Sequence, residues 1–427
     1  MIRKDFYQPH QHTSDNGTQI IVTPIPSARS VGISIYLKSG SRYEEHSEIA
    51  GISHFLEHIC FKGTTNRPTP RDISFAIDSL GGTINAATYK EMTCYYAKVA
   101  SEFTNQTLDL LLDMVQNSVC LDEEIERERG VILEELAAVQ DTPSELASLL
   151  MDSLIWPNQP HGRDIAGDNE SVSNISRSTI ISAYHKQYVA NNAIISIAGA
   201  IESNEAIELI NEKINNWQPG QPNQWLPNRS LNNKRSGLIS KDTGQTHIIV
   251  GMDSISSVNE QRYALDLLSI CLGEGMSSRL FLRLREELGL CYDIHSYSTQ
   301  LLDTGMFGIY AGVDSSNIEK TLANIRSELE KLSNPIENFE LERAKSIMRS
   351  RIELSMENTR AVSAWYGTLA TLEQQIIQPE KALENYEKVK PKDIQKLFQE
   401  IYLPDKTFLS IVGPLQSIEP FEEVLFD

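Results

Sequence analysis

Cysteine is scarce in this 427-residue chain, and its spacing excludes two common uses of the residue. A disulfide scaffold or a cysteine-rich zinc module needs an even or closely spaced set of cysteines. Here the number is odd and no C-x-x-C pair occurs among Cys60, Cys94, Cys120, Cys271 and Cys291. The pattern predicts isolated core thiols in a reducing compartment.

Long hydrophobic runs are also missing. The most apolar uncharged stretch, residues 187–201, contains the polar residues Asn191 and Asn192. It is also too short for a transmembrane helix, which needs about 20 residues to cross a bilayer. The first residues, MIRKDF, lead into polar residues rather than an apolar secretion segment. We expect a cytoplasmic protein without a membrane partner, and a processed organellar form is the alternative.

Basic residues are outnumbered, with 38 Lys and Arg against 58 Asp and Glu and a net charge of −20. No basic patch interrupts this balance, so nucleic acid is excluded as the expected partner. Two interpretations of the acidity stay open. It attracts basic peptides as substrates, or it only keeps the protein soluble.

The order of predicted elements repeats in the two halves of the chain. Each half has, in order, a β-rich stretch, a helix-rich stretch, two strands and a further helix. In the first half these are residues 18–36, 49–80, 83–100 and 105–118. In the second half they are residues 238–252, 262–288, 291–313 and 318–332. This predicts an α+β fold of two homologous α/β-roll-like domains from an internal duplication, each an antiparallel-rich sheet flanked by helices. A Pro-, Gly- and Asn-rich linker at 217–236 would separate domains 1–216 and 237–427.

The sequence His54-Phe55-Leu56-Glu57-His58 carries the clearest chemistry. It is the reverse of the H-E-x-x-H metalloprotease motif. Apolar residues at 49, 52, 56 and 59 predict a helix, on which residues four apart share one face. Both imidazoles can then bind one metal, while Glu57 can take a proton from a metal-bound water. The alternative is a histidine pair with a purely polar or structural role.

A catalytic zinc usually has three protein ligands, so a third donor must come from elsewhere in the chain. Residues 123–136 predict an acidic helix with an apolar stripe. Glu128 and Glu135 are seven positions apart and share a face within about 20°, whereas Glu134 lies about 100° from Glu135. Without the histidine motif, a solvated acidic helix would be the simpler interpretation.

Together these residues resemble the pitrilysin/insulinase superfamily of zinc peptidases, and in particular its short members similar to mitochondrial processing peptidase. The match rests on H-x-x-E-H, on Glu135 after 76 intervening residues, and on the flanking Gly40-Ser41-Arg42 and Phe61-Lys62-Gly63-Thr64. The resemblance implies one Zn²⁺ per chain, held by His54, His58 and Glu135. It further implies that Glu57 is the general base and that Glu128 supports catalysis.

The resemblance also implies substrate-binding residues outside the zinc motif. Arg285 and Tyr292, seven apart in the second half, match an arginine and a tyrosine that bind substrate. Asn85 and Ala86 match a strand that holds an extended peptide. Without the resemblance, Arg285 and Tyr292 would be read as structural, and Gly81-Gly82 as a turn into an ordinary strand.

The expected function is a zinc-dependent endopeptidase that hydrolyses peptides or unfolded segments inside a chamber enclosed by two chains. Because one chain carries both the zinc set and the Arg–Tyr pair, the resemblance favours a homodimer. Two alternatives remain: a non-catalytic structural or assembly subunit on the same fold, and a zinc hydrolase that acts on other substrates.

Overall fold

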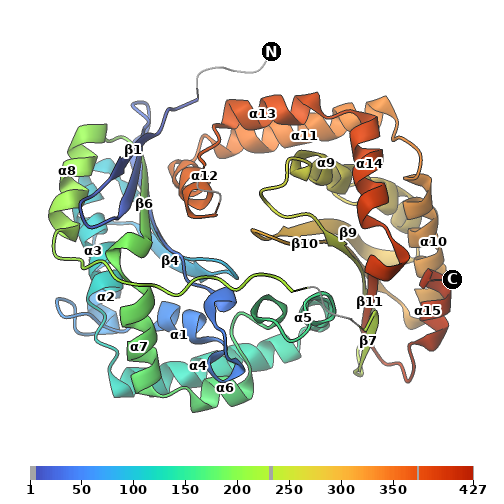
Figure 1. Ribbon diagram of the computed structural model, residues 1–427, viewed down its shortest axis with the longest axis horizontal. Helices are drawn as coiled ribbons and strands as arrows, with labels where there is room; N and C mark the ends of the chain where they lie inside the picture. Colours follow the sequence, from blue (N-terminus) through green and yellow to red (C-terminus); the bar gives the residue numbers. More distant parts are fainter. Residues whose placement is uncertain (1–5, 230–233, 373–374, 427) are drawn as a thin grey trace. The chain divides into compact units, whose positions relative to one another are not determined.

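A computed structural model describes residues 6–229, 234–372 and 375–426, and it divides into two compact units, each built around one sheet (Figure 1). Unit 1 consists of Met1–Leu136, Asp164–Leu226 and Ile352–Glu380. Unit 2 consists of Ala137–Arg163, Pro227–Arg351 and Lys381–Asp427. The predicted α+β class, with two helix-flanked sheets, is confirmed.

The sheet of unit 1 has the strand order β1-β2-β6-β3-β5-β4. Only β2 and β6 run parallel; all other neighbours are antiparallel. The strands are β1 (His10–Thr13), β2 (Gln19–Pro24), β3 (Ser30–Leu37), β4 (Thr83–Thr88), β5 (Thr93–Ala100) and β6 (Ala193–Gly199). The accompanying helices are α1 (Ile52–Ile59), α2 (Pro70–Asp78), α3 (Thr104–Gln116), α4 (Asp122–Gln140), α6 (Asn169–Asn174), α7 (Arg177–Gln187) and α8 (Ser203–Ile214).

The sheet of unit 2 repeats this topology with the order β7-β11-β8-β10-β9 and one parallel pair, β7 with β11. Its strands are β7 (Ser236–Ser240), β8 (Thr246–Ser254), β9 (Cys291–Gln300), β10 (Gly305–Val313) and β11 (Thr407–Gly413). The later helices are α9 (Arg262–Leu272), α10 (Ile318–Lys331), α11 (Asn338–Ser355), α13 (Pro379–Lys388), α14 (Pro391–Ile401) and α15 (Glu419–Phe426), and a π-helix covers Phe281–Glu287. The predicted repetition of elements is therefore found again in the strand order.

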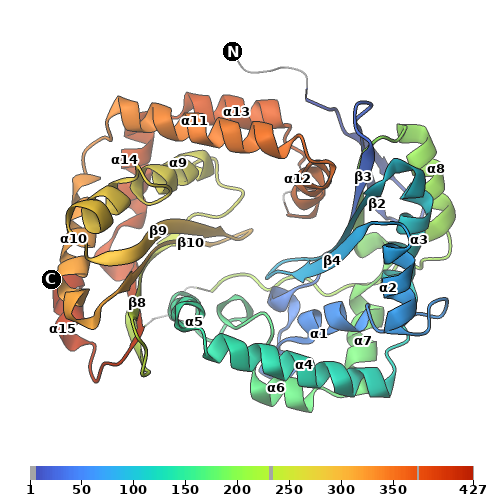
Figure 2. The same cartoon turned by 180° about the vertical axis from the view of Figure 1, so that it is seen from behind.

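Each sheet is covered on one face by a helix from the opposite half of the sequence. Helix α12 (Thr359–Leu372) contacts β3 and β6 of unit 1, and α5 (Pro143–Ile155) contacts β8 and β11 of unit 2 (Figures 1 and 2). Equivalent serines fasten the two helices. Ser196 on β6 donates to the Ser363 carbonyl of α12 at 2.8 Å, and Ser410 on β11 donates to the Ala147 carbonyl of α5 at 2.7 Å.

Helices α5 and α12 explain why the two compact units differ in their boundaries from the predicted domains 1–216 and 237–427, separated by a linker at 217–236. Strands β6 and β11 are buried at every position, so both faces of each sheet centre need an apolar cover. Helices α5 and α12 supply the second cover. Residues 217–229 of the predicted linker contain no helix or strand, and residues 230–233 lie outside the described residues.

No helix within the described ranges is long and apolar enough to cross a membrane.

Close backbone contact between β3 and the start of α12 gives a test of this arrangement. A Cβ at Gly32 would lie 2.6 Å from the Arg360 Cα, so Gly32→Ala should destabilise the protein by about 1–3 kcal/mol. Gly130 on α4 is the matched control, since a Cβ there has open space and should stabilise by about 0.5–1 kcal/mol. Urea unfolding of both variants measures this, and equal stabilities would contradict the described packing.

Candidate active site

Helix α1 is short, and its position is fixed at its first turn. The Glu44 carboxylate accepts hydrogen bonds from the backbone N–H groups of Gly51 and Ser53, both at 2.9 Å. A carboxylate here satisfies donors that the helix itself leaves unpaired and complements the helix dipole. Gly51 has φ +89°, and a Cβ at this residue would lie 2.3 Å from the Ala166 carbonyl oxygen. Glu44 and Gly51, which precede the histidine motif in the sequence, therefore fix the position of the helix that carries it.

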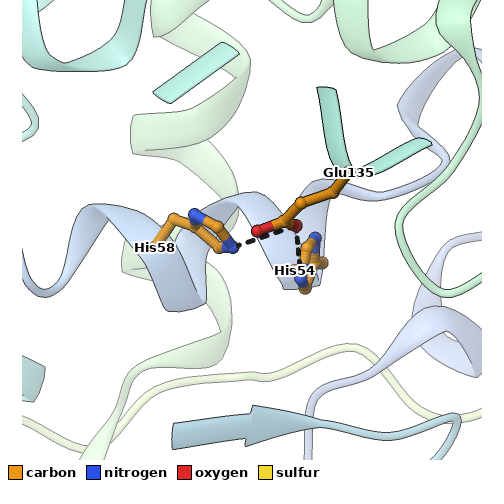
Figure 3. A group of neighbouring side chains, drawn as sticks. All are labelled: His54, His58 and Glu135. Atoms are coloured by element: carbon orange, nitrogen blue, oxygen red, sulfur yellow. Dashed lines mark ion pairs between the residues drawn. The ribbon is translucent and has the colours of Figure 1, made fainter. Parts of the chain in front are cut away.

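The predicted metal ligands converge in unit 1. His54 and His58 point from α1 toward Glu135 of α4 (Figure 3). Glu135 Oε2 lies 3.7 Å from His54 Nε2 and 3.6 Å from His58 Nε2. All three donor atoms lie within 4.8 Å of one another, and among the described residues this is the one such group of three His, Cys, Asp or Glu side chains.

This donor set fits zinc. Ligand atoms of tetrahedral zinc, each about 2.0–2.1 Å from the metal, are separated by about 3.4 Å, close to the distances found here. Burial, with the nearby His58, lowers the pKa of His54 to about 4, so its imidazole is neutral, as metal binding requires. In the described part of the chain, the buried Nδ1 of His54 has no hydrogen-bond partner.

Glu128 holds His58 in the tautomer that a metal ligand needs. His58 Nδ1 lies 3.0 Å from Glu128 Oε2, and a carboxylate can only accept, so Nδ1 carries the hydrogen and Nε2 faces Glu135. Lys62 contacts the other Glu128 oxygen at 2.8 Å. Burial alone would raise the pKa of Glu128, but the bonds to His58 and Lys62 hold it below its ordinary value.

Glu57 lies between the two histidines in sequence and is held by a residue that the motif did not reveal. Thr88, the last residue of β4, donates its hydroxyl hydrogen to Glu57 Oε2 at 2.5 Å. Burial raises the pKa of Glu57, while the hydrogen bonding from Thr88 and the charge of His58 oppose the rise. A half-buried carboxylate with a raised pKa is suited to accept and return a proton.

Strand β4, which carries Asn85 and Ala86, lies at an edge of its sheet. Asn85 is exposed and Ala86 is buried, and the Asn85 side chain accepts a hydrogen bond from the Ala86 backbone N–H at 2.8 Å. A sheet edge of this kind can pair with an extended peptide.

Arg285 and Tyr292 are brought together in unit 2. The Arg285 guanidinium lies over two rings, 4.8 Å from the centre of Tyr292 and 4.7 Å from that of Phe281. Phe281 and Arg285 both belong to the π-helix, a rare element often found at functional sites. Tyr292 is 74% exposed and is the second residue of the edge strand β9, so it is accessible.

Four contributing residues were not assigned from the sequence: Glu44, Lys62, Thr88 and Phe281. Glu44 and Lys62 lie close to the histidine motif in the sequence, one before it and one after it, so each had a weak local signal. The contact of Thr88 with Glu57 joins a strand end to a helix, and no local pattern predicts it.

Comparisons with known proteins identify the family and agree with this fold. The family described as "Insulinase (Peptidase family M16)" matches residues 19–169, and "Peptidase M16 inactive domain" matches residues 174–348. A chain of Rickettsia bellii named "Uncharacterized zinc protease" is 34% identical over 400 residues, which are 93% of this chain and 96% of that relative.

Two solved structures show the same fold. A protease from Helicobacter pylori has a TM-score of 0.89 at 22% identity, over 96% of this chain and 100% of that one. A chain in Complex III2 from Candida albicans has a TM-score of 0.84 at 17% identity, over 97% and 99% of the two chains. The fold and the two family matches define a chain built of M16-like domains. The protein belongs to the insulinase, or peptidase M16, family.

The third ligand can be tested by a pair of neighbouring substitutions. Glu135→Gln should weaken zinc binding by more than about 100-fold, because it removes an anionic donor rather than a surrounding contact. Glu134→Gln, an exposed neighbour outside the donor group, should leave zinc affinity unchanged. Zinc content after dialysis against a chelator series measures both, and equal retention by the two variants would reject Glu135 as a ligand.

Proposed function

We propose that this protein is a zinc-dependent endopeptidase that hydrolyses peptides or unfolded segments and is similar to mitochondrial processing peptidase. The observation that carries the proposal is the convergence of His54, His58 and Glu135 beside a half-buried carboxylate, Glu57, held by Thr88. The names of relatives such as the Rickettsia bellii zinc protease support it.

Each residue has a distinct part in the proposed reaction. His54, His58 and Glu135 would hold zinc, which when bound polarises the scissile carbonyl and makes water more acidic. Glu57 accepts the proton of the attacking water and later delivers it to the leaving amine. Glu128 keeps the His58 ring oriented through the bond to Nδ1.

Substrate contacts are assigned on the resemblance. The edge of β4 around Asn85 and Ala86 would pair with the extended peptide backbone. Arg285 and Tyr292 would donate hydrogen bonds to a substrate carbonyl or to the developing oxyanion. Contacts with the rings of Phe281 and Tyr292 restrict the rotamers of Arg285, so less entropy is lost when it binds.

The alternative is a non-catalytic subunit on the same fold. The likeness to a chain of Complex III2 concerns the fold alone, so it does not decide between the two functions. What favours catalysis is that the donors and the base are all present and in contact distance in one unit. A subunit that needs only the fold has no use for a half-buried carboxylate beside two imidazoles.

Glu57→Gln tests the proposal directly. Peptide hydrolysis should fall by about 100- to 10,000-fold, the usual contribution of a general base, while zinc stays bound because Glu57 is not a ligand. Glu48→Gln, at an exposed position before α1, is the matched control and should keep full activity. Cleavage of a mixed peptide library by wild type and both variants, with zinc analysis, is the measurement. A wild type that cleaves nothing when loaded with zinc would support the non-catalytic subunit instead.

We further propose that two identical chains enclose the chamber in which cleavage occurs, because this chain carries both the zinc set and the Arg–Tyr pair. Active samples should therefore be dimeric by light scattering at the concentrations used in assays. Activity that stays proportional to protein in samples containing only monomer would reject the chamber. A preference for basic peptides rests on the net charge of −20 alone and stays a secondary proposal.

A further inference from the structure

Strand β4 and the candidate base meet at one side chain. Thr88 ends β4, and its Oγ1 lies 2.5 Å from Glu57 Oε2 on α1. We propose that Thr88 is a positioning residue that fixes the Glu57 carboxylate relative to the substrate-binding edge of β4, an inference that rests on the proposed peptidase function.

The direction of the hydrogen bond follows from the neighbouring groups. A hydroxyl has a single hydrogen, and a carboxylate only accepts, so the Thr88 hydrogen is on the Glu57 side. Thr93, opposite Thr88 in the β4–β5 register, approaches Thr88 Oγ1 at 3.4 Å but donates its own hydrogen to the Ser39 carbonyl at 2.9 Å. The Thr88 hydroxyl is thus directed at the carboxylate.

Glu57 needs such a partner because the rest of its side chain does not determine how the carboxylate is turned. The terminal torsion of glutamate has a broad distribution rather than sharp rotamers. One short, charge-assisted hydrogen bond removes much of this freedom. A base held in this way does not have to be oriented at the moment of reaction, which is a large part of the advantage of a preorganised site.

The same strand supplies the edge on which we expect the peptide to pair. Ala86 lies two positions before Thr88, which is about 7 Å along an extended strand. Strand β4 would therefore position both the peptide paired beside Asn85 and Ala86 and the Glu57 carboxylate held by Thr88. Movement of β4 would shift both together, and the distance between the scissile bond and the base would be preserved.

The experiment compares two substitutions at Thr88 with one at Thr83, at the other end of β4. Thr88→Val keeps the shape and removes the hydroxyl, so kcat should fall about 10- to 100-fold with KM within about twofold and zinc content unchanged. Thr88→Ser keeps the hydroxyl and should restore kcat to within about threefold of wild type. Thr83→Val makes the same change at an exposed site and should leave both constants unaltered. If Thr88→Val does not fold, Thr88→Ala takes its place.

A second measurement separates positioning from strand integrity. In the Glu57→Gln background, adding Thr88→Val should not change the Kd of a substrate peptide, because the contact acts through the carboxylate. Weakened peptide binding there, loss of zinc, or a wild-type kcat in Thr88→Val would each overturn the inference while leaving the peptidase proposal intact. A zinc-loaded wild type without peptidase activity would overturn both.

Discussion

His58 donates its Nδ1 hydrogen to Glu128, and this bond joins α1 to α4 where the metal donors converge. It fixes the tautomer of His58 and so directs Nε2 toward Glu135. Burial works to lower the pKa of His58, but the bond to Glu128 and the charges of Glu135 and Glu57 together raise it. Without Glu128, the imidazole would be free to turn and the donor group would lose its shape.

The sheets explain why such a short helix can carry a precise site. Helix α1 contacts the edge strand β4 as well as β5, and its first turn is capped by Glu44. Strand β4 is paired on one side only, which leaves its other side for a peptide. The second unit repeats the strand order without the histidine motif, and Tyr292, near the start of its edge strand β9, is exposed and lies close to Arg285. The repeated fold thus supplies two similar edges, and β4 is the one in contact with the helix that carries His54 and His58.

Much of this architecture could be predicted from the sequence because it depends on local patterns. Spacing of four between His54 and His58, and of seven between Glu128 and Glu135, predicted which side chains share a helix face. The repeated order of predicted strands and helices in the two halves predicted two similar sheets. The choice of Glu135 over Glu128 as the ligand did not follow from spacing alone; it came from the family resemblance, and the distances agree with it.

The sequence by itself determined the helices, the strands, the repeated order and the relative placement of donors within each helix, since these follow from interactions between residues close in the chain. Only the tertiary structure decided that α5 and α12 cover the sheets of the opposite halves. An amphipathic helix can pack its apolar side against any apolar sheet face, so its sequence does not show which sheet it will cover. The contact between Thr88 and Glu57 was decided in the same way. It depends on how β4 packs against α1, a pairing of segments distant in sequence that no local period encodes.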